Sequence, residues 1–484
     1  MSWPGASAPG VSNWCMAMGK YIGKYWGLLW WVGVMGMVPV DALADPVDAY
    51  IRQQMDRYHI PGLALAVVQG GRVVKLQGYG RASVEHDVPT TVNSVFEIGS
   101  ISKQMTAAAI LLLVEEEQVD LDASIHTYIP KLPPLWQGVT LRHLLTHTSG
   151  IKNYTGLPGF GLSRRLNRAG FVHELSTYPL DFAPGDFWAY SNSGYNLLGY
   201  IIEQASGMPH WSFLKARIFD PLRMASTRDR DLIHVFPYRV TGYEWYDEVL
   251  QGRDYELTDL FAAGAIVSTV SDLVKWNAAL STTDFLTADS MKEMWKQARL
   301  NNGETYPYGF GWNIEEIRGI RRLRHNGQTA GFSSNFTHYP DHNLTLIILC
   351  NLGTIDLAAW IAHGLAKHYL PDFSLSRAIP IFASQPAMTR RFKTVVQDQL
   401  EGRISVGEFT LEACSSLVLD HTETMYRRMA AYGALSEFEL ISEEKRPQGR
   451  RLYYRAAIGE RLVLFRFDVT NDARISSLIV EEEE

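Results

Sequence analysis

The chain has 484 residues, of which 46% are hydrophobic and 20% are charged. This composition is ordinary for a globular protein, and the length is enough to bury a large core. The net charge of −7 argues against nucleic acid as a partner, because binding a phosphate backbone needs a basic face.

Residues 1–44 have the pattern of a signal peptide. Lys20 and Lys24 precede the uncharged run YWGLLWWVGVMGMVPV, whose 16 residues fall short of the roughly 20 that span a bilayer. The run is followed by the small-x-small sequence ALA at 42–44, which is typical of a cleavage site. We expect export to the periplasm or the medium, with no stable membrane span after cleavage. An uncleaved N-terminal anchor is the alternative.

The next part of the chain, residues 45–370, is predicted to form an α+β domain. Two apolar runs flank Gly70 and Gly71, which predicts a β-hairpin. Helical patterns then alternate with loops to about Leu300, and strand patterns return from Tyr306. Strands at both ends with helices between them predict one antiparallel sheet built from both halves of the domain. Helices would flank the sheet, and a helical subdomain would be inserted in the middle.

A second, small α+β domain is predicted at 387–484, after a linker at 371–386. The linker, PDFSLSRAIPIFASQP, is rich in Pro and Ser and has no clear period. Two helical patterns and four alternating strand-like runs follow, as in an antiparallel sheet packed on helices. No grouping of Ser, His or Cys suggests chemistry here, so we expect a structural cover or a shaper of substrate access.

The cysteines and histidines indicate neither a disulfide framework nor a metal site. Cys350 ends the apolar run LTLIILC and is expected in the core, and whether it pairs with Cys414 stays open. His143 and His147 have metal-ligand spacing, but Leu144 stands where a zinc protease needs glutamate. We expect no cofactor and no metal.

The pattern Ser-x-x-Lys, a candidate nucleophile and base, occurs four times, at Ser100/Lys103, Ser149/Lys152, Ser212/Lys215 and Ser442/Lys445. Ser100 stands at the predicted start of a helix, where a lysine three residues later lies on the same face. A helix start also offers free N–H groups to a developing oxyanion. A plain N-cap is the alternative for Ser100.

Two later segments carry further polar groups. FWAYSNSGYNLLGY has Tyr190 and Asn192 just before a predicted helix, and RLRHNGQTAGFSSNF has His325, Asn326 and Gly327 at the end of a predicted strand. Taken singly, the first is explained by a capping turn and the second by a polar strand end.

Together, the three segments resemble in order the three signatures of the serine β-lactamase/penicillin-binding-protein-like hydrolases. The resemblance is nearest to the branch with class C β-lactamases, esterases and D-aminopeptidases. It covers roughly residues 47–353 and includes, in family order, IPGLALAVVQGGRVV, FEIGSISKQMTA, LDASIHTYIP, VTLRHLLTHTSGI, PGDFWAYSNSGYNLLGYIIE, AAGAIVSTVSDL, YGFGW and HNGQTAGFSS. The segment at 387–484 resembles cystatin-like or NTF2-like domains.

The resemblance implies a role for each matching residue. Ser100 would be the acyl-accepting nucleophile, with Lys103 and Tyr190 sharing the base and acid work. Asn192 would hydrogen-bond the acyl-side amide of the substrate or hold Lys103. The oxyanion hole would be formed by the backbone N–H groups of Ser100 and Gln328.

The third signature departs from the family pattern. Many members carry Lys-Thr-Gly where this chain has His325, Asn326 and Gly327. This puts β-lactam recognition in doubt and leaves acyl transfer intact; we assign Asn326 and Gly327 to substrate binding. As a hypothesis, a protonated His325 lowers the pKa of Tyr190.

The resemblance implies an exported serine hydrolase that forms an acyl-enzyme on Ser100. Its substrate would be an ester or amide in a small molecule or short peptide, as in esterases and D-amino-acid peptidases. One alternative is a β-lactamase or D-alanyl-D-alanine carboxypeptidase. Another is a β-lactam or muropeptide sensor that acylates without turnover. The sequence leaves the oligomeric state open.

Overall fold

The computed structural model describes residues 45–482, apart from 130, 159–166, 232, 256, 318, 382–385, 404, 411–412, 414–421 and 447–448. The predicted signal peptide and Cys414 lie outside the described residues. Asp45–Glu484 form one compact unit. Within the described ranges, every helix is too short or too polar to cross a bilayer.

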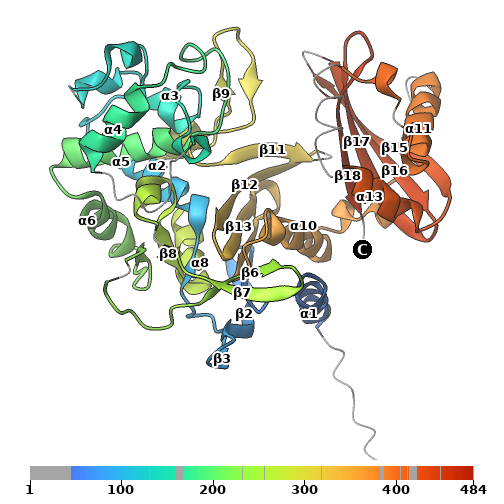
Figure 1. The fold of residues 1–484 in the computed structure, drawn as a ribbon, viewed down its shortest axis with the longest axis horizontal. Helices are drawn as coiled ribbons and strands as arrows, with labels where there is room; N and C mark the ends of the chain where they lie inside the picture. Colours follow the sequence, from blue (N-terminus) through green and yellow to red (C-terminus); the bar gives the residue numbers. More distant parts are fainter. Residues whose placement is uncertain are drawn as a thin grey trace, which may run out of the picture. The chain divides into compact units, whose positions relative to one another are not determined.

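A seven-stranded sheet lies at the centre of residues 45–370, with strand order β11-β12-β13-β14-β1-β2-β3 and antiparallel pairing between each pair of neighbours. Its strands are β1 (Gly62–Gln69), β2 (Arg72–Ser83), β3 (Val88–Pro89), β11 (Asn313–Ile317), β12 (Ile320–Thr329), β13 (Phe332–Tyr339) and β14 (Leu344–Cys350). β1 pairs with β14, with Leu63 opposite Cys350. The prediction of one sheet built from both halves is confirmed (Figure 1).

The two faces of the sheet are covered by different helices, because alternate residues of a strand point to opposite faces. Leu346 and Ile348 of β14 belong to a core shared with α1 (Pro46–Tyr58) and α10 (Leu357–Tyr369). Ile347 and Leu349 belong to a second core, which includes Trp276 of α8 (Val270–Ala279). The apolar run LTLIILC is therefore buried on both faces.

The helical region between the sheet strands is organised around α2 (Ser102–Glu115), which is buried along nearly its whole length. A helix that is apolar on all sides has to be enclosed by other elements. It packs against α5 (Asn192–Ser206) and α7 (Phe261–Gly264). The other helices here are α3 (Leu141–Leu145), α4 (Arg168–Ser176), α6 (His210–Leu214) and α9 (Ala288–Met294).

Short strands lie beside this helical region. They are β4 (Phe96–Glu97), β5 (Arg228–Asp229), β6 (Gly242–Tyr246), β7 (Val249–Arg253), β8 (Ile266–Ser268), β9 (Ala298–Arg299) and β10 (Thr305–Tyr306). β4 and β5 pair on either side of β8. This small sheet fixes the chain immediately before the segment Gly99–Ile101.

The C-terminal part has a four-stranded antiparallel sheet with helices. The elements are α11 (Pro386–Leu400), α13 (Thr422–Ala430), β15 (Leu435–Arg446), β16 (Gly449–Ile458), β17 (Arg461–Thr470) and β18 (Ile475–Glu482), with the strands in sequence order in the sheet. Phe392 of α11 stacks on Phe467, with ring centroids 4.4 Å apart. A separate aromatic core thus joins the helix to the sheet. The resemblance to cystatin-like or NTF2-like domains stays a prediction.

The segment predicted as a linker packs against this C-terminal sheet. Leu375 contacts a small cluster with Ile441 and Tyr453, and the backbone N–H of Ile381 donates to the carbonyl of Leu440 at 2.8 Å. The guanidinium of Arg455 donates to the carbonyls of Leu375 and Ala378. The chain between the two parts is therefore held by backbone and side-chain contacts.

Candidate active site

Ser100 lies in the 3₁₀ turn Gly99–Ile101, which runs directly into α2. Gly99 has a φ of +50°, and a Cβ at this position would lie 2.6 Å from the backbone nitrogen of Gln328. Only glycine allows both the left-handed conformation and this close approach. The turn is thereby pressed against β12, so that Ser100 borders the third predicted signature.

The hydroxyl of Ser100 lies within hydrogen-bond distance of two predicted partners. Lys103 Nζ is 3.0 Å from Ser100 Oγ, and the Tyr190 hydroxyl donates to the same oxygen at 2.8 Å. The serine side chain is half-buried, whereas the lysine side chain is fully enclosed. Residues separated by ninety positions in the chain therefore meet at one oxygen atom.

Lys103 contacts three oxygen atoms. One is Ser100 Oγ. The other two accept hydrogen bonds from Nζ: Asn192 Oδ1 at 2.8 Å and the carbonyl oxygen of Ala263 at 2.7 Å. None of these three oxygen atoms belongs to a carboxylate. Burial without a compensating negative charge lowers the pKa of Lys103 well below its usual value. A lysine in this environment can lose its proton and act as a base.

Tyr190 lies in the segment before α5, with its ring centroid 4.8 Å from Lys103 Nζ. Burial raises the pKa of the Tyr190 phenol above its usual value, although the hydrogen bond to Ser100 opposes this shift. Tyr190 is therefore a neutral phenol that can donate a proton. The following residue, Ser191, is the N-cap of α5, and Asn192 is its first residue.

His325 lies in β12, enclosed and 4% exposed. Its Nδ1 is 2.7 Å from the carbonyl of Asn326, which can only accept, so Nδ1 carries the proton. Its Nε2 then accepts from the Tyr308 hydroxyl, 2.9 Å away. Burial lowers the pKa of His325 to about 3.

These findings contradict the hypothesis that a protonated His325 lowers the pKa of Tyr190. The imidazole is neutral at physiological pH, and the pKa of Tyr190 is raised. The two rings are neighbours, with centroids 6.2 Å apart. The reason for the error is desolvation: a buried ring between a tyrosine and a backbone carbonyl does not hold a charge.

The other predicted substrate-binding residues divide into two groups. The Asn192 amide binds Lys103, and its Nδ2 donates to Thr155 Oγ1 at 3.3 Å. The Asn326 side chain points away from the Ser100 cluster: its Oδ1 accepts from Asn335, and its Nδ2 donates to Asp356 Oδ1 at 2.7 Å.

The remaining two predicted substrate-binding residues, Gly327 and Gln328, approach the turn at Ser100 with their backbones. A Cβ at Gly327 would lie 2.0 Å from the carbonyl oxygen of Ile98, so the strand backbone approaches the turn before Ser100 closely. The Gln328 side chain donates to the carbonyl of Gly353 at 2.9 Å, and its backbone nitrogen faces Gly99.

The other Ser-x-x-Lys pairs have no comparable surroundings in the part of the chain that the structure describes. Lys152 pairs with Asp181, and Lys215 pairs with Asp220. Ser442 lies within the C-terminal strand β15. Among the described residues of these four pairs, only Ser100 and Lys103 have a hydrogen bond between their own side chains.

Three site groups were not assigned a role from the sequence: the Ala263 carbonyl, the Tyr308 hydroxyl and the imidazole of His147. Ala263 and Tyr308 lie in AAGAIVSTVSDL and YGFGW, which were used only as segments of the resemblance. His147 was considered as a metal ligand, but its Nδ1 accepts the backbone N–H of Ser191 at 3.1 Å. A backbone carbonyl leaves no signal in a single sequence.

The chain was compared with known proteins. The family model described as "Beta-lactamase" matches residues 47–362. Penicillin-binding protein 4* of Bacillus subtilis (strain 168) is 34% identical over 315 residues, which cover 61% of this chain and 69% of that protein. A D-aminopeptidase of Gluconobacter oxydans (strain 621H) is 24% identical over 357 residues, covering 71% of this chain and 66% of that protein. About a third of each relative therefore lies outside the match.

Solved structures of the same fold include relatives of these proteins. The D-amino acid amidase of Ochrobactrum anthropi SV3 is 26% identical, with a TM-score of 0.58 over 66% of this chain and 95% of that chain. The octameric penicillin-binding protein homologue of Pyrococcus abyssi has the same fold, with a TM-score of 0.60 and 21% identity over 90% of this chain and 95% of that chain. The chain belongs to the Beta-lactamase family, whose serine hydrolases include penicillin-binding-protein-like, D-aminopeptidase and D-amino acid amidase types.

Proposed function

We propose that the protein is a hydrolase that forms an acyl-enzyme on Ser100. The observation that carries this proposal is the set of oxygen atoms around Lys103 Nζ. Asn192 Oδ1 and the Ala263 carbonyl can only accept, so they take two hydrogens of the amine. A neutral Lys103 then has its lone pair left for the Ser100 hydroxyl, 3.0 Å away. This is the arrangement of a nucleophile with its base.

In the acylation step, Ser100 Oγ bonds to the acyl carbon and its proton passes to Lys103 Nζ. The bond from the acyl carbon to the leaving nitrogen or oxygen then breaks, and that atom takes the proton of the Tyr190 hydroxyl. The proton on Lys103 returns to the tyrosinate. In deacylation, water adds to the acyl carbon, its proton goes to the same pair, and Ser100 Oγ is reprotonated as the ester bond breaks.

The developing oxyanion would be stabilised by the backbone N–H groups of Ser100 and Gln328. The closeness of Gly99 to the Gln328 nitrogen supports this assignment, because it brings the two backbones together beside Ser100.

For the substrate, we propose an ester or amide of a D-amino acid or a short peptide whose leaving group carries no carboxylate. A neutral His325 supplies no positive charge to bind a carboxylate, as a lysine would at this position. β-Lactams and D-alanyl-D-alanine peptides carry such a carboxylate. The relatives named D-aminopeptidase and D-amino acid amidase support the same choice.

We also propose that the protein is exported and cleaved after Ala44, and that residues 387–484 form an accessory domain behind the linker. The mature protein would begin at Asp45, immediately before the N-terminus of α1. Intact mass of protein recovered from the periplasm or medium tests the cleavage. A mass that includes residues 1–44 would contradict it.

The experiment that tests the catalytic proposal uses three classes of probe on the full chain and on Ser100→Ala. We expect a fluorophosphonate to add one adduct, located on Ser100 by peptide mapping, and no adduct on the variant. D-phenylalanine amide and p-nitrophenyl esters should be turned over faster than nitrocefin and faster than L-phenylalanine amide.

Other outcomes of this experiment would contradict the proposal or favour one of the alternative functions. Absence of any adduct at Ser100 would contradict the nucleophile. Rapid turnover of nitrocefin would favour a β-lactamase, and a stable penicilloyl adduct without turnover would favour the sensor. Comparable rates on D- and L-phenylalanine amide would contradict the proposed stereochemistry.

A further inference from the structure

His147 lies at the edge of the candidate site and has no role in the steps above. It follows α3 and has a φ of +60°, a conformation that only a few per cent of residues other than glycine adopt, with asparagine, aspartate and histidine the most frequent among them. It is 1% exposed. A histidine held in a left-handed conformation inside the core indicates that the surroundings require it there.

His147 binds the backbone on both sides of Tyr190. The N–H of Ala189 donates to the His147 carbonyl at 2.9 Å, and the N–H of Ser191 donates to its Nδ1 at 3.1 Å. One residue therefore accepts from the amides immediately before and after the tyrosine. Because Nδ1 accepts, the ring proton is on Nε2. Burial lowers the pKa of His147 well below its usual value, so the ring stays neutral.

The ring of His147 also packs on the two tyrosines of the site. Its centroid lies 4.4 Å from that of Tyr190 and 4.6 Å from that of Tyr308. Within the described residues, Nε2 has no hydrogen-bond partner. The imidazole therefore acts through one acceptor atom and through its ring contacts. Of the three tyrosine rings that it contacts, Tyr190 is bonded to Ser100 and Tyr308 to His325, and the third is Tyr195, 5.1 Å away between centroids.

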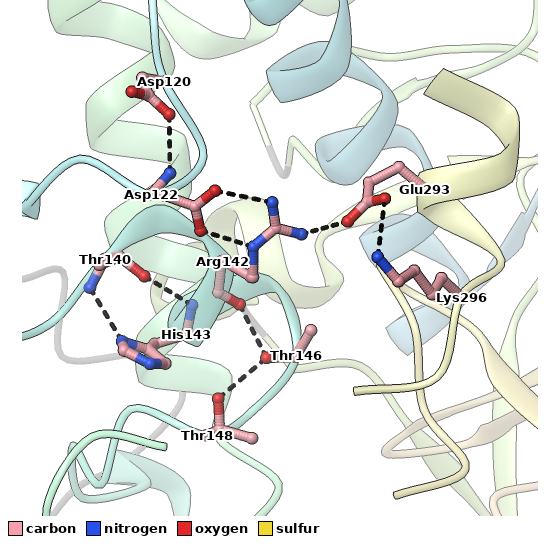
Figure 2. Close-up of polar contacts among 9 residues, drawn as sticks. All are labelled: Asp120, Asp122, Thr140, Arg142, His143, Thr146, Thr148, Glu293 and Lys296. Atoms are coloured by element: carbon pink, nitrogen blue, oxygen red, sulfur yellow. Dashed lines mark hydrogen bonds and ion pairs between the residues drawn. The ribbon is translucent and has the colours of Figure 1, made fainter. Parts of the chain in front are cut away.

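The residues before and after His147 are held by polar contacts around Arg142, Thr146 and Thr148 (Figure 2). Arg142 of α3 donates to Asp122 at 2.6 and 2.9 Å and also pairs with Glu293 of α9. After the helix, Thr146 Oγ1 donates to the Arg142 carbonyl at 2.7 Å and lies 2.9 Å from Thr148 Oγ1. The residues on both sides of His147 are thus tied to a helix that is itself anchored at two points.

We propose that His147 is a positioning residue, which holds the backbone on both sides of Tyr190 and thereby keeps the phenol against Ser100 Oγ. The proposal rests on the proposed function for its kinetic consequence only. The geometric claim concerns the loop at 189–191 and can be measured without turnover.

Three variants separate the acceptor atom from backbone strain. His147→Asn keeps an acceptor near the place of Nδ1 and tolerates a positive φ. His147→Leu removes the acceptor and keeps the strain, whereas His147→Gly removes both. We expect kcat/KM on a p-nitrophenyl ester to fall on the order of a hundredfold in the Leu and Gly variants, mainly through kcat, because a displaced catalytic group costs about that much. The Asn variant should stay within about tenfold of wild type.

Amide hydrogen exchange, measured by mass spectrometry on the peptide 187–195, tests the geometric claim. We expect faster exchange in the Leu and Gly variants and near wild-type exchange in the Asn variant. His210→Leu is the matched control, because it removes another fully buried imidazole whose ring nitrogens have no partner among the described residues. It should change neither the exchange of this peptide nor kcat/KM beyond twofold.

The outcomes distinguish the two proposals. Unchanged exchange at 187–195 in the Leu and Gly variants would overturn the positioning role, whatever the activity. Equal kcat/KM losses in the Asn, Leu and Gly variants would also overturn it, because the acceptor would then not matter. If Ser100 in wild type accepts no fluorophosphonate while exchange follows the acceptor, the proposed function fails and the positioning role stands.

Discussion

The Nε2 atom of His325 lies 2.9 Å from the hydroxyl of Tyr308, and the imidazole is neutral. The third signature therefore presents an uncharged ring to the site, where a lysine would present a permanent charge. This difference concerns the substrate more than the chemistry at Ser100, since the nucleophile, the lysine and the phenol are in contact without it.

A neutral His325 predicts a pH profile without a histidine limb. Its folded pKa of about 3 lies well below 6.5, so the ring does not titrate between pH 5 and 8. We expect the kcat/KM profiles of wild type and His325→Gln to have the same shape in this range, with an absolute loss of about tenfold from the altered contact with Tyr308. A limb near pH 6.5 in wild type that disappears in the variant would contradict the neutral ring.

His325→Lys predicts a change of substrate. We expect a lower KM for nitrocefin, which carries a carboxylate, and little change in KM for an uncharged p-nitrophenyl ester. Steady-state kinetics on both substrates measure this difference. An equal change in KM on both would show that the position does not select for charge.

Lys103→Met is expected to abolish activity and to stabilise the fold. Loss of the base should lower kcat/KM by about 10²- to 10⁴-fold. In wild type, burial lowers the pKa of Lys103 in the folded state. The contribution of Lys103 to stability is therefore complete only above its unfolded pKa of about 10.5 and is lost progressively as pH falls. Thermal unfolding should therefore show a larger advantage for Lys103→Met at pH 7 than at pH 9.

Lys215→Met is the control for this prediction, because Lys215 belongs to another Ser-x-x-Lys pair and its side chain is 67% exposed. It should change stability and activity little. If Lys103→Met were less stable than wild type at pH 7, burial would not be the dominant influence on this lysine.

Gly99→Ala is expected to damage both stability and activity. The added Cβ would lie 2.6 Å from the Gln328 nitrogen, at a φ of +50°. Gly71→Ala is a matched control, because Gly71 also has a positive φ, +74°, but a Cβ there meets nothing within 4 Å. We expect Gly71→Ala to cost about 1 kcal/mol of unfolding free energy and no activity. Gly99→Ala should cost more and lower kcat/KM about a hundredfold; equal effects would contradict the close approach.

Buried neutral histidines predict acid sensitivity. Burial lowers the pKa of His210 to about 3, below the unfolded value of about 6.5. Its contribution to stability is therefore complete above pH 6.5 and is lost progressively as pH falls toward 3. The loss at pH 5 is about 2 kcal/mol of unfolding free energy. Urea unfolding from pH 7 to 5 should show a smaller loss for His210→Leu than for wild type. Identical pH dependence would indicate that the ring gains a proton without penalty.

The sheet could be predicted because its pattern is local. The run LTLIILC and the apolar runs on either side of Gly70 and Gly71 have lengths typical of strands. Burial on both faces follows from composition for LTLIILC and for the run before Gly70, whereas the run after Gly71 is largely exposed. The meeting of Ser100 with Lys103 follows from helix spacing. Tyr190 and Asn192 were placed by resemblance, since nothing local links them to a serine ninety positions earlier.

Two features of the third signature differ in how far the sequence predicts them. The opposite directions of the His325 and Asn326 side chains follow from strand alternation and could have been predicted; the role of Asn326 in substrate binding stays a prediction. The neutral state of His325 could not have been predicted, since it depends on how deeply tertiary packing encloses the ring. The same holds for His147, whose two contacts with the segment at 189–191 join loops that are distant in the chain.

The pairing of β1 with β14 has a consequence for how the protein folds. β1, an inner strand of the sheet, is synthesised early, but its partner β14 ends at Cys350, so nearly three hundred residues must be made before the two can join. Until then an apolar strand edge stays open, and such long-range pairing is slow and prone to aggregation. We therefore expect fragments ending before β14 to aggregate, and refolding of the full chain to depend on a chaperone or on low concentration.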